Sequence, residues 1–133
     1  MIDVASFFVI KALESLAGAE SEYANGRWNN CASRCYYATF QAAIAALMRA
    51  GIQPSGSSGQ WSHAYVPAQF EDQLIRRRKL YPTELRGVLA ITYDLRRRAD
   101  YAAAPVSQTE VSRVLRRTRT FVQRVDAGGG EAR

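Results

Sequence analysis

The 133-residue chain has little of what metal sites and many catalytic sites are built from, with one histidine and two cysteines. A structural zinc site takes four Cys or His ligands, so the sequence predicts no metal centre. Glycine-rich phosphate loops and motifs that pair a nucleophile with a base are also missing. Most enzyme classes therefore lack support, and we expect no cofactor.

Long apolar runs are absent as well. No stretch approaches the roughly 18 uninterrupted apolar residues of a transmembrane helix, so no membrane-spanning segment and no membrane partner are expected. The chain opens Met1-Ile2-Asp3, with an acidic residue where a secretory signal needs a cation. Cys31 and Cys35 lie four residues apart in an expected helix, a spacing that disfavours a mutual disulfide. These features predict a cytoplasmic protein with two buried, reduced thiols.

Lysine is scarce too, because Lys11 and Lys79 are the only lysines among 18 basic residues. The first 60 residues carry four basic and four acidic side chains, so the net charge of +6 comes from residues 61–133. A guanidinium is a planar fork that matches a phosphate, which makes this basic half compatible with an RNA or nucleotide partner. A GC-rich genome produces the same preference for arginine without functional meaning, and net charge alone does not decide between the two.

What the sequence contains almost everywhere is helical spacing, and no segment alternates in polarity as a strand does. We predict helices over residues 4–24 and 28–50, from near Tyr65 to the cations at 76–79, from Pro82-Thr83, and from the capping box Ser107-Gln108-Thr109-Glu110. The expected fold is all-α, a four-helix up-and-down bundle with a short additional helix. It forms one domain over residues 1–127, followed by a disordered tail over 128–133.

The segment 28–50 is apolar on two sides, which predicts that it forms the central helix. A polar stripe runs along it, formed by Asn30, Arg34, Tyr37 and Gln41. The first helix has one apolar stripe, formed by Val9, Ala12, Leu13, Leu16, Ala19 and Tyr23. Phe7 and Ile10 lie off that stripe, and surplus apolar surface of this kind predicts a homodimer.

Three stretches of the sequence resemble the motifs of one prokaryotic protein family. Residues 26–43 read Gly-Arg-Trp-Asn-Asn-Cys-Ala-Ser-Arg-Cys-Tyr-Tyr-Ala-Thr-Phe-Gln-Ala-Ala and are similar to a family pattern containing Ser-Arg-x-Tyr-Tyr-Ala. His63 stands seven residues before Phe70, as in the family's His-x6-Phe. Residues 95–101, Leu-Arg-Arg-Arg-Ala-Asp-Tyr, resemble its Leu-Arg-x-x-Ala-Asp-Tyr signature. The resemblance extends over nearly the whole chain and identifies the domain as HEPN-like.

This resemblance implies a helical bundle that usually dimerises. Many members are ribonucleases or toxins of toxin–antitoxin and phage-defence systems, often encoded beside a minimal nucleotidyltransferase partner. The family's ribonuclease motif has an Arg and then a His, with four to six positions between them, but here Asp100-Tyr101 stands about where the His is expected. An aspartic acid ordinarily has a pKa of about 3.9 and is a poor general acid at neutral pH. The sequence therefore predicts weak or absent RNA cleavage.

The catalytic candidates are Arg96, Asp100 and His63, and RNA or nucleotide binding is assigned to Arg96, Arg97, Arg98, Tyr101, Arg34 and Tyr37. Arg96 can clamp a phosphate while Asp100, four residues on, fixes its rotamer; the alternative is a simple surface ion pair. Imidazole titrates near pH 6.5, which suits His63 for proton transfer.

The other candidates also have structural alternatives. His63 can be a partly buried, hydrogen-bonded histidine that shares a helical face with Val66, Phe70 and Leu74. Arg34 and Tyr37 either form a buried polar network between helices or line a groove. Tyr101 can stack on a base, or accept a nucleotidyl group as a motif tyrosine does in some relatives.

Two hypotheses about function follow. In the first, the chain is an RNA-directed HEPN protein of a toxin–antitoxin or phage-defence system. In the second, it is a non-catalytic assembly module that docks a nucleotidyltransferase or another defence partner through its helical faces.

Overall fold

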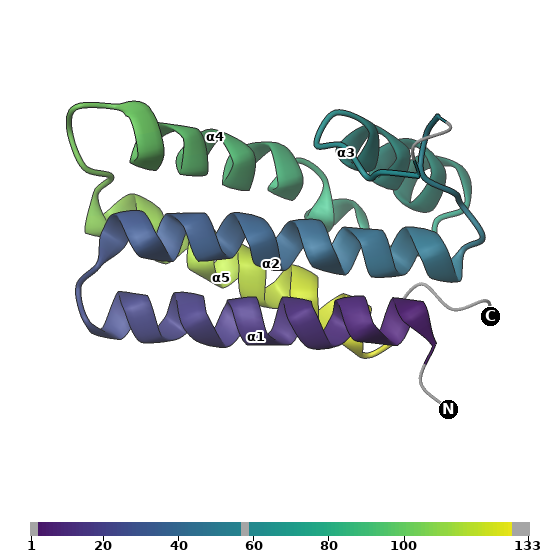
Figure 1. The fold of residues 1–133 in the computed structure, drawn as a ribbon, viewed down its shortest axis with the longest axis horizontal. Helices are drawn as coiled ribbons and strands as arrows, with labels where there is room; N and C mark the ends of the chain where they lie inside the picture. The colour runs from purple at the N-terminus through teal and green to yellow at the C-terminus, as the bar shows by residue number, and fades with distance from the viewer. Residues whose placement is uncertain (1–2, 57–58, 129–133) are drawn as a thin grey trace.

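The computed structural model describes residues 3–56 and 59–128 and contains the predicted helical bundle. The helical elements are α1 (Val4–Ala24), α2 (Trp28–Arg49), α3 (Tyr65–Gln69), η1 (Phe70–Arg77), η2 (Thr83–Leu85), α4 (Val88–Tyr101) and α5 (Gln108–Asp126). Helices α1 and α4 lie on either side of α2 and run antiparallel to it, while α5 crosses behind (Figure 1). This arrangement confirms the prediction of an all-α up-and-down bundle.

Helix α2 is the central helix, as predicted, because it packs against α1, α4 and α5. Its buried positions are rich in alanine, which lets the neighbouring helix backbones approach closely. Where α2 meets α4, the hydroxyl groups of Thr39 and Thr92 lie 2.9 Å apart in the fully buried interior. Each hydroxyl is also within hydrogen-bond distance of a carbonyl of its own helix, so neither is left unsatisfied.

Helix α1 has the predicted bounds because both ends carry suitable residues. At the N-terminus, the Asp3 side chain accepts a hydrogen bond from the Ser6 N–H at 2.9 Å. After the C-terminus, Gly26 adopts a positive φ of 73°, which turns the chain away from the helix. Phe7 and Ile10 are about half exposed, at 51% and 52%, as the sequence predicts. Leu13 was expected in the buried stripe, but 36% of its surface is exposed because it lies at the edge of that stripe.

The short third helix begins at Tyr65, where Pro67 is tolerated in the first turn. It continues as the π-helical segment η1, so that the predicted apolar face of Val66, Phe70 and Leu74 is fully buried. Phe70 packs on Phe121 of α5, with ring centroids 4.9 Å apart. This contact joins the short helical segment to the bundle.

The predicted start of the fourth helix at Pro82-Thr83 is wrong. Those residues form only the single 3-10 turn η2, after which Arg86 is extended and Gly87 takes a left-handed φ of 81°. Helix α4 then begins at Val88, and the carboxylate of Glu71 accepts the Gly87 N–H at 2.7 Å. The break therefore depends on a glycine conformation and on a partner 16 residues away, neither of which helical spacing reveals.

Helix α5 starts at the predicted cap but uses only half of the capping box. The Ser107 hydroxyl accepts a hydrogen bond from the Glu110 N–H, whereas the Glu110 carboxylate pairs with Arg98 of α4. The inward face of α5 is buried as expected, at Val111, Val114, Leu115, Thr118, Phe121, Val122 and Val125. Of the predicted disordered tail, Gly128 lies in a turn and residues 129–133 lie outside the described residues.

Within the described ranges, no helix is long and apolar enough to cross a membrane.

Candidate functional site

The candidate site is centred on Arg96, which α4 places against two tyrosines of α2. The Arg96 guanidinium carbon lies 5.1 Å from the ring centroid of Tyr36 and 5.5 Å from that of Tyr37. Both distances are within the range of a cation–π interaction. Arg96 Nη2 also donates to the Tyr37 hydroxyl at 3.4 Å. The side chain is therefore held by α2 and retains 24% exposure to solvent.

Asp100 lies one helical turn after Arg96 and completes this arrangement. Its Oδ2 is 3.4 Å from Arg96 Nε, at the i,i+4 spacing the sequence predicts. The Asp100 side chain is 36% exposed, so the pair lies at the rim and not in the core. The ion pair is present, and its proposed rotamer-fixing role remains a prediction.

Tyr36 lies beneath Arg96 and is 4% exposed, as expected for a core residue. Its burial raises the pKa of Tyr36 to about 12, although the positive charge of Arg96 acts in the opposite direction. The phenol therefore stays protonated at neutral pH. Tyr36 can support a cation with its ring face but cannot serve as a base.

A second group of rings extends this surface towards the start of α3. Tyr93 of α4 has its ring centroid 5.7 Å from that of Tyr36 and 5.1 Å from that of His63. The Arg97 guanidinium carbon is 5.9 Å from the Tyr93 ring centroid. Tyr93 thus links His63 and Arg97 to the residues around Arg96.

The interpretation of His63 as a partly buried residue on the face of the third helix is wrong. The helix begins at Tyr65, so His63 lies in the preceding turn, is exposed and contacts the ring of Tyr93. The sequence places His63 far from Arg97, whereas the fold brings both to the same tyrosine.

Arg98 does not share the surroundings of Arg96. Its Nε lies 3.1 Å from Asp94, and its guanidinium also binds the carboxylate of Glu110, with Nη1 at 3.0 Å from Oε1. The hydrogen bonds from Arg98 hold the pKa of Glu110 below its ordinary value. Arg98 therefore joins α4 to α5, and its charge is already matched by two carboxylates.

Arg34 and Tyr37 line a shallow depression of about 300 Å³, together with Glu22, Asn30 and Ser33. Arg34 is exposed, and its side chain lies along α1, where a Cβ added at Gly18 would be 3.6 Å from Arg34 Cδ. Arg34 therefore lines a groove, which is one of the two predicted alternatives. Tyr37 lines the same depression and also forms a contact between helices, with Arg96.

Tyr101 ends α4 with 79% exposure and is open to solvent. Four further basic residues have carboxylate partners. Arg76 and Arg77 both pair with Asp72 within η1, Arg119 of α5 pairs with Glu20 of α1, and Arg124 of α5 lies 3.6 Å from Glu84 of η2.

The two cysteines are buried and are not joined by a disulfide, in agreement with the sequence prediction. The hydrogen bond with Cys35, together with burial, raises the pKa of the Cys31 thiol. The residues at 3–56 and 59–128 hold no group of three or more His, Cys, Asp or Glu side chains able to bind a metal.

The sequence model of the HEPN domain matches residues 5–128 of this chain. The chain belongs to the HEPN domain family. A relative of this HEPN protein in Methanocaldococcus jannaschii is named "Putative toxin MJ0605". The two are 27% identical over 115 residues, which cover 86% of this chain and 80% of the relative. The family resemblance predicted from the sequence is thereby confirmed.

Neither Tyr93 nor the contact between Tyr36 and Arg96 was predicted from the sequence of this HEPN domain. Tyr93 precedes Arg96 by three residues and Arg97 by four, so a helical projection places it on their face. The sequence gives no comparable indication for Tyr36, because it has the pattern of an ordinary core residue. Its contact with the Arg96 guanidinium depends on the packing of α4 against α2.

Proposed function

We propose that this HEPN protein is a toxin-like component of a toxin–antitoxin or phage-defence system and binds RNA or a nucleotide at the Arg96 surface. By that surface we mean Arg34, Tyr37, Tyr93, Arg96 and Arg97. The name of the Methanocaldococcus jannaschii relative supports the toxin-like role. The binding role rests on the chemistry of the arginines and tyrosines themselves.

The observation that carries the proposal is the position of the Arg96 guanidinium over Tyr36 and Tyr37. Aromatic rings hold a guanidinium without neutralising its charge, so the cation stays available to a phosphate. Tyr37 is 37% exposed, and an exposed ring beside a cation can stack on an unpaired base. Arg97, exposed beside Tyr93, adds a second cation.

We expect little RNA cleavage by the isolated protein. Metal-independent cleavage needs a group that transfers a proton next to a cation that stabilises the phosphate. Asp100 is paired with Arg96 and is better suited to orienting it than to acid catalysis. His63 reaches the edge of this surface through Tyr93, and it is the remaining candidate for proton transfer.

Binding is tested with a fluorescein-labelled single-stranded RNA, by fluorescence anisotropy at low salt. Arg96→Ala should weaken binding by about tenfold or more, as expected for loss of a charged hydrogen-bond donor. Arg113→Ala removes the same charge from an exposed position on α5 and should change the affinity less than twofold. Equal affinity of wild type and Arg96→Ala would contradict the proposed site.

Cleavage is tested with unlabelled single-stranded RNA in EDTA, beside Arg96→Ala and His63→Ala variants. We expect weak or no cleavage by all three proteins. Robust cleavage by the wild type that is lost in both variants would show this expectation wrong and make His63 the catalytic residue.

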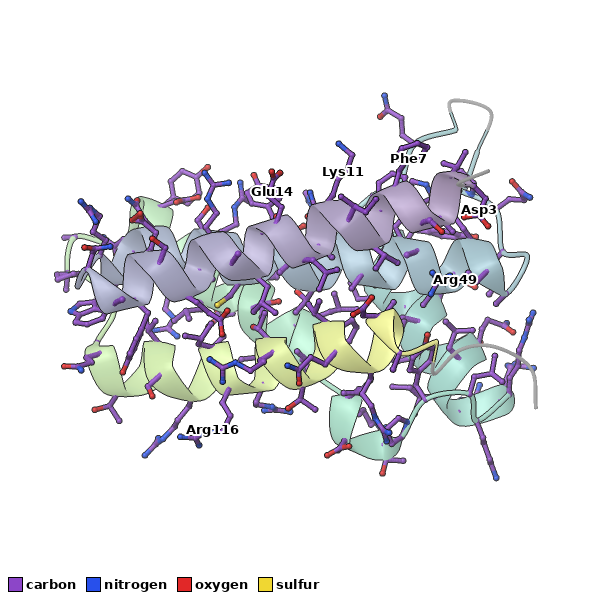
Figure 2. The ribbon with its side chains drawn as sticks, turned by 90° about the horizontal axis from the view of Figure 1, so that it is seen from below. Asp3, Phe7, Lys11, Glu14, Arg49 and Arg116 are labelled. Atoms are coloured by element: carbon purple, nitrogen blue, oxygen red, sulfur yellow. The ribbon has the colours of Figure 1, made fainter. Side chains whose placement is uncertain are left out.

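We also propose that the protein is a homodimer, because α1 exposes an apolar surface. Val4, Phe7 and Ile10 are each more than half exposed there. Figure 2 shows Phe7, Lys11 and Glu14 along the side of α1 that faces away from α5. Opposite charges beside the apolar residues suit a two-fold contact between copies, in which Lys11 of one copy meets Glu14 of the other.

The same apolar surface is the observation that favours the second function, docking of a nucleotidyltransferase or another defence protein. Light scattering at micromolar concentration separates the two. Phe7→Asp should convert a dimer into a monomer. Ala90→Asp adds the same charge at an exposed position of α4 and should leave the dimer intact. A wild-type monomer would contradict the homodimer and leave α1 available to a partner protein.

A further inference from the structure

The shallow depression lined by Arg34 and Tyr37 lies between the last turn of α1, which carries Glu22, and the first turns of α2. Figure 1 shows that α1 ends and α2 begins at the same end of the bundle at which α4 ends. The Tyr37 hydroxyl accepts a hydrogen bond from Arg96, so the depression adjoins the Arg96 guanidinium. Anything bound in it is therefore next to the proposed RNA-binding residues.

Glu22 is an unexpected residue at the edge of a surface that binds phosphates. Its carboxylate repels the phosphate groups that Arg34 and Arg96 attract. The exposed Arg27 offsets this repulsion only in part, because its Nε is 3.9 Å from Glu22 Oε2. A carboxylate at this position suits the hydrogen-bond donors of a base better than it suits the RNA backbone.

The two oxygens of the Glu22 carboxylate have different surroundings. Asn30 Nδ2 donates to Oε2 at 3.1 Å, and the long contact with Arg27 is to the same oxygen. No residue in the ranges 3–56 and 59–128 donates a hydrogen bond to Oε1. An ionised carboxylate has about four lone-pair sites, so Asn30 can orient Glu22 while most of its acceptor capacity stays available.

Tyr37 supplies the other end of the depression, about 10 Å from Asn30 along the axis of α2. Its ring is partly exposed and is held in place by the hydrogen bond from Arg96. Proteins that recognise single-stranded RNA stack unpaired bases on such rings and bind their Watson–Crick edges. A volume of about 300 Å³ is at the lower end of small-ligand sites, which suits a single base.

The edge of the base determines which base a carboxylate accepts. Guanine has two adjacent donors on its Watson–Crick edge, the N1–H and the N2 amino group, which match the two oxygens of a carboxylate. Adenine and cytosine have one amino group beside an acceptor nitrogen, and uracil has one N–H between two carbonyl acceptors. A carboxylate cannot donate to those acceptors, because it is an acceptor only.

We propose that the depression selects guanine, with the base stacked on Tyr37 and its N1–H and N2 amino group bound by Glu22. Arg34 binds the phosphate of the same nucleotide. Its side chain is exposed and forms no ion pair with a carboxylate in the described part of the chain. This inference rests on the proposed function, because it assigns a base preference to RNA bound at the Arg96 surface.

The base preference is tested by fluorescence anisotropy at low salt. The probes are fluorescein-labelled oligouridines of equal length with guanosine, inosine or adenosine at the central position, beside an all-uridine RNA. Wild-type protein should bind the guanosine RNA about tenfold more tightly than the adenosine RNA, as expected for hydrogen bonds to a charged group. Inosine lacks only the N2 amino group of guanosine, so its RNA should bind with intermediate affinity.

Glu22→Gln is the matching protein variant, because it keeps the length of the side chain and an oxygen for Asn30. It should remove the preference for guanosine and bind the all-uridine RNA at least as tightly as the wild type, since a negative charge is lost. Glu84→Gln makes the same change at an exposed position of η2, outside the depression, and should retain the preference.

Two results would overturn the base preference alone. The first is equal affinity of the wild type for the guanosine and adenosine RNAs, with Arg96→Ala still weakening the binding of both. The second is a preference for guanosine that Glu22→Gln retains, which would leave Glu22 as a structural partner of Arg27 and Asn30. Failure of every RNA to bind the wild type would overturn the proposed function and this inference together.

Discussion

Arg96 and Arg98 lie two residues apart on α4, but on different faces of the helix. Their guanidinium groups therefore contact different neighbours. On the α2 side, Arg96 lies over the rings of Tyr36 and Tyr37 and has one carboxylate partner, Asp100. On the α5 side, Arg98 is bound by Asp94 and Glu110. The rings hold the Arg96 guanidinium without adding negative charge, so one carboxylate faces Arg96, whereas two face Arg98. The contacts across the helix interfaces therefore distinguish Arg98, which joins α4 to α5, from Arg96, which we propose binds RNA.

The largest expected effect is that of salt on RNA binding. If Arg34, Arg96 and Arg97 neutralise three phosphates of a single strand, the affinity should fall about 15- to 20-fold between 50 and 200 mM salt. Anisotropy titrations at four salt concentrations measure the slope of log affinity against log salt. Arg96→Ala should lower that slope by about 0.7, and an affinity that ignores salt would mean that the arginines reflect composition alone.

A pair of conservative substitutions tests the comparison directly. Lysine keeps the charge but cannot lie flat on two rings or present a fork of donors. Arg96→Lys should therefore weaken RNA binding by about tenfold, while Arg98→Lys should change it less than twofold. The same anisotropy assay measures both, and equal losses in the two variants would show that the surroundings of the two arginines do not matter for binding.

The smallest expected effect is the pH dependence of stability contributed by Glu110. Because Arg98 lowers the pKa of Glu110 in the folded protein, the pair stabilises the fold above the ordinary value of 4.5. That contribution is lost as the pH falls through the lowered folded pKa. Glu110→Gln should lower the free energy of unfolding by about 0.5 kcal/mol at pH 7, as for a mostly exposed pair.

Urea unfolding at pH 7 and pH 3 measures this difference, which should shrink at the lower pH. Asp126→Asn, at an exposed position of α5, is the control and should show no loss of stability at either pH. A loss of equal size at both pH values would mean that the Glu110 side chain acts by packing and not by charge.

Much of the fold could be predicted because its signals are local. Asn25-Gly26 ends α1, and Ser107 begins α5, at the positions that their side chains predict. The start of α4 could not be predicted, since it depends on a left-handed Gly87 bonded to the distant Glu71. Local chemistry gives the ends of helices, while breaks that depend on tertiary contacts need the structure.

The candidate site was predictable only in part for the same reason. The pairing of Arg96 with Asp100 follows from their spacing on one helix. Which of three adjacent arginines meets rings and which meets carboxylates depends on the rotation of α4 against α2 and α5. The exposed position of His63 depends on where α3 begins.

The buried hydroxyl pair of Thr39 and Thr92 bears on the position of α4 against α2 at the Arg96 surface. Thr39 follows Tyr36 by three residues and Thr92 precedes Arg96 by four, so the hydroxyl contact is about one helical turn from the guanidinium. Sliding α4 along α2 by one turn, about 5.4 Å, would part the two hydroxyls inside an apolar interior. The hydroxyl contact therefore favours one register of α4 against α2. The guanidinium is thereby held over its rings in the folded chain, so the proposed RNA-binding surface is preorganised and needs no movement of one helix against the other.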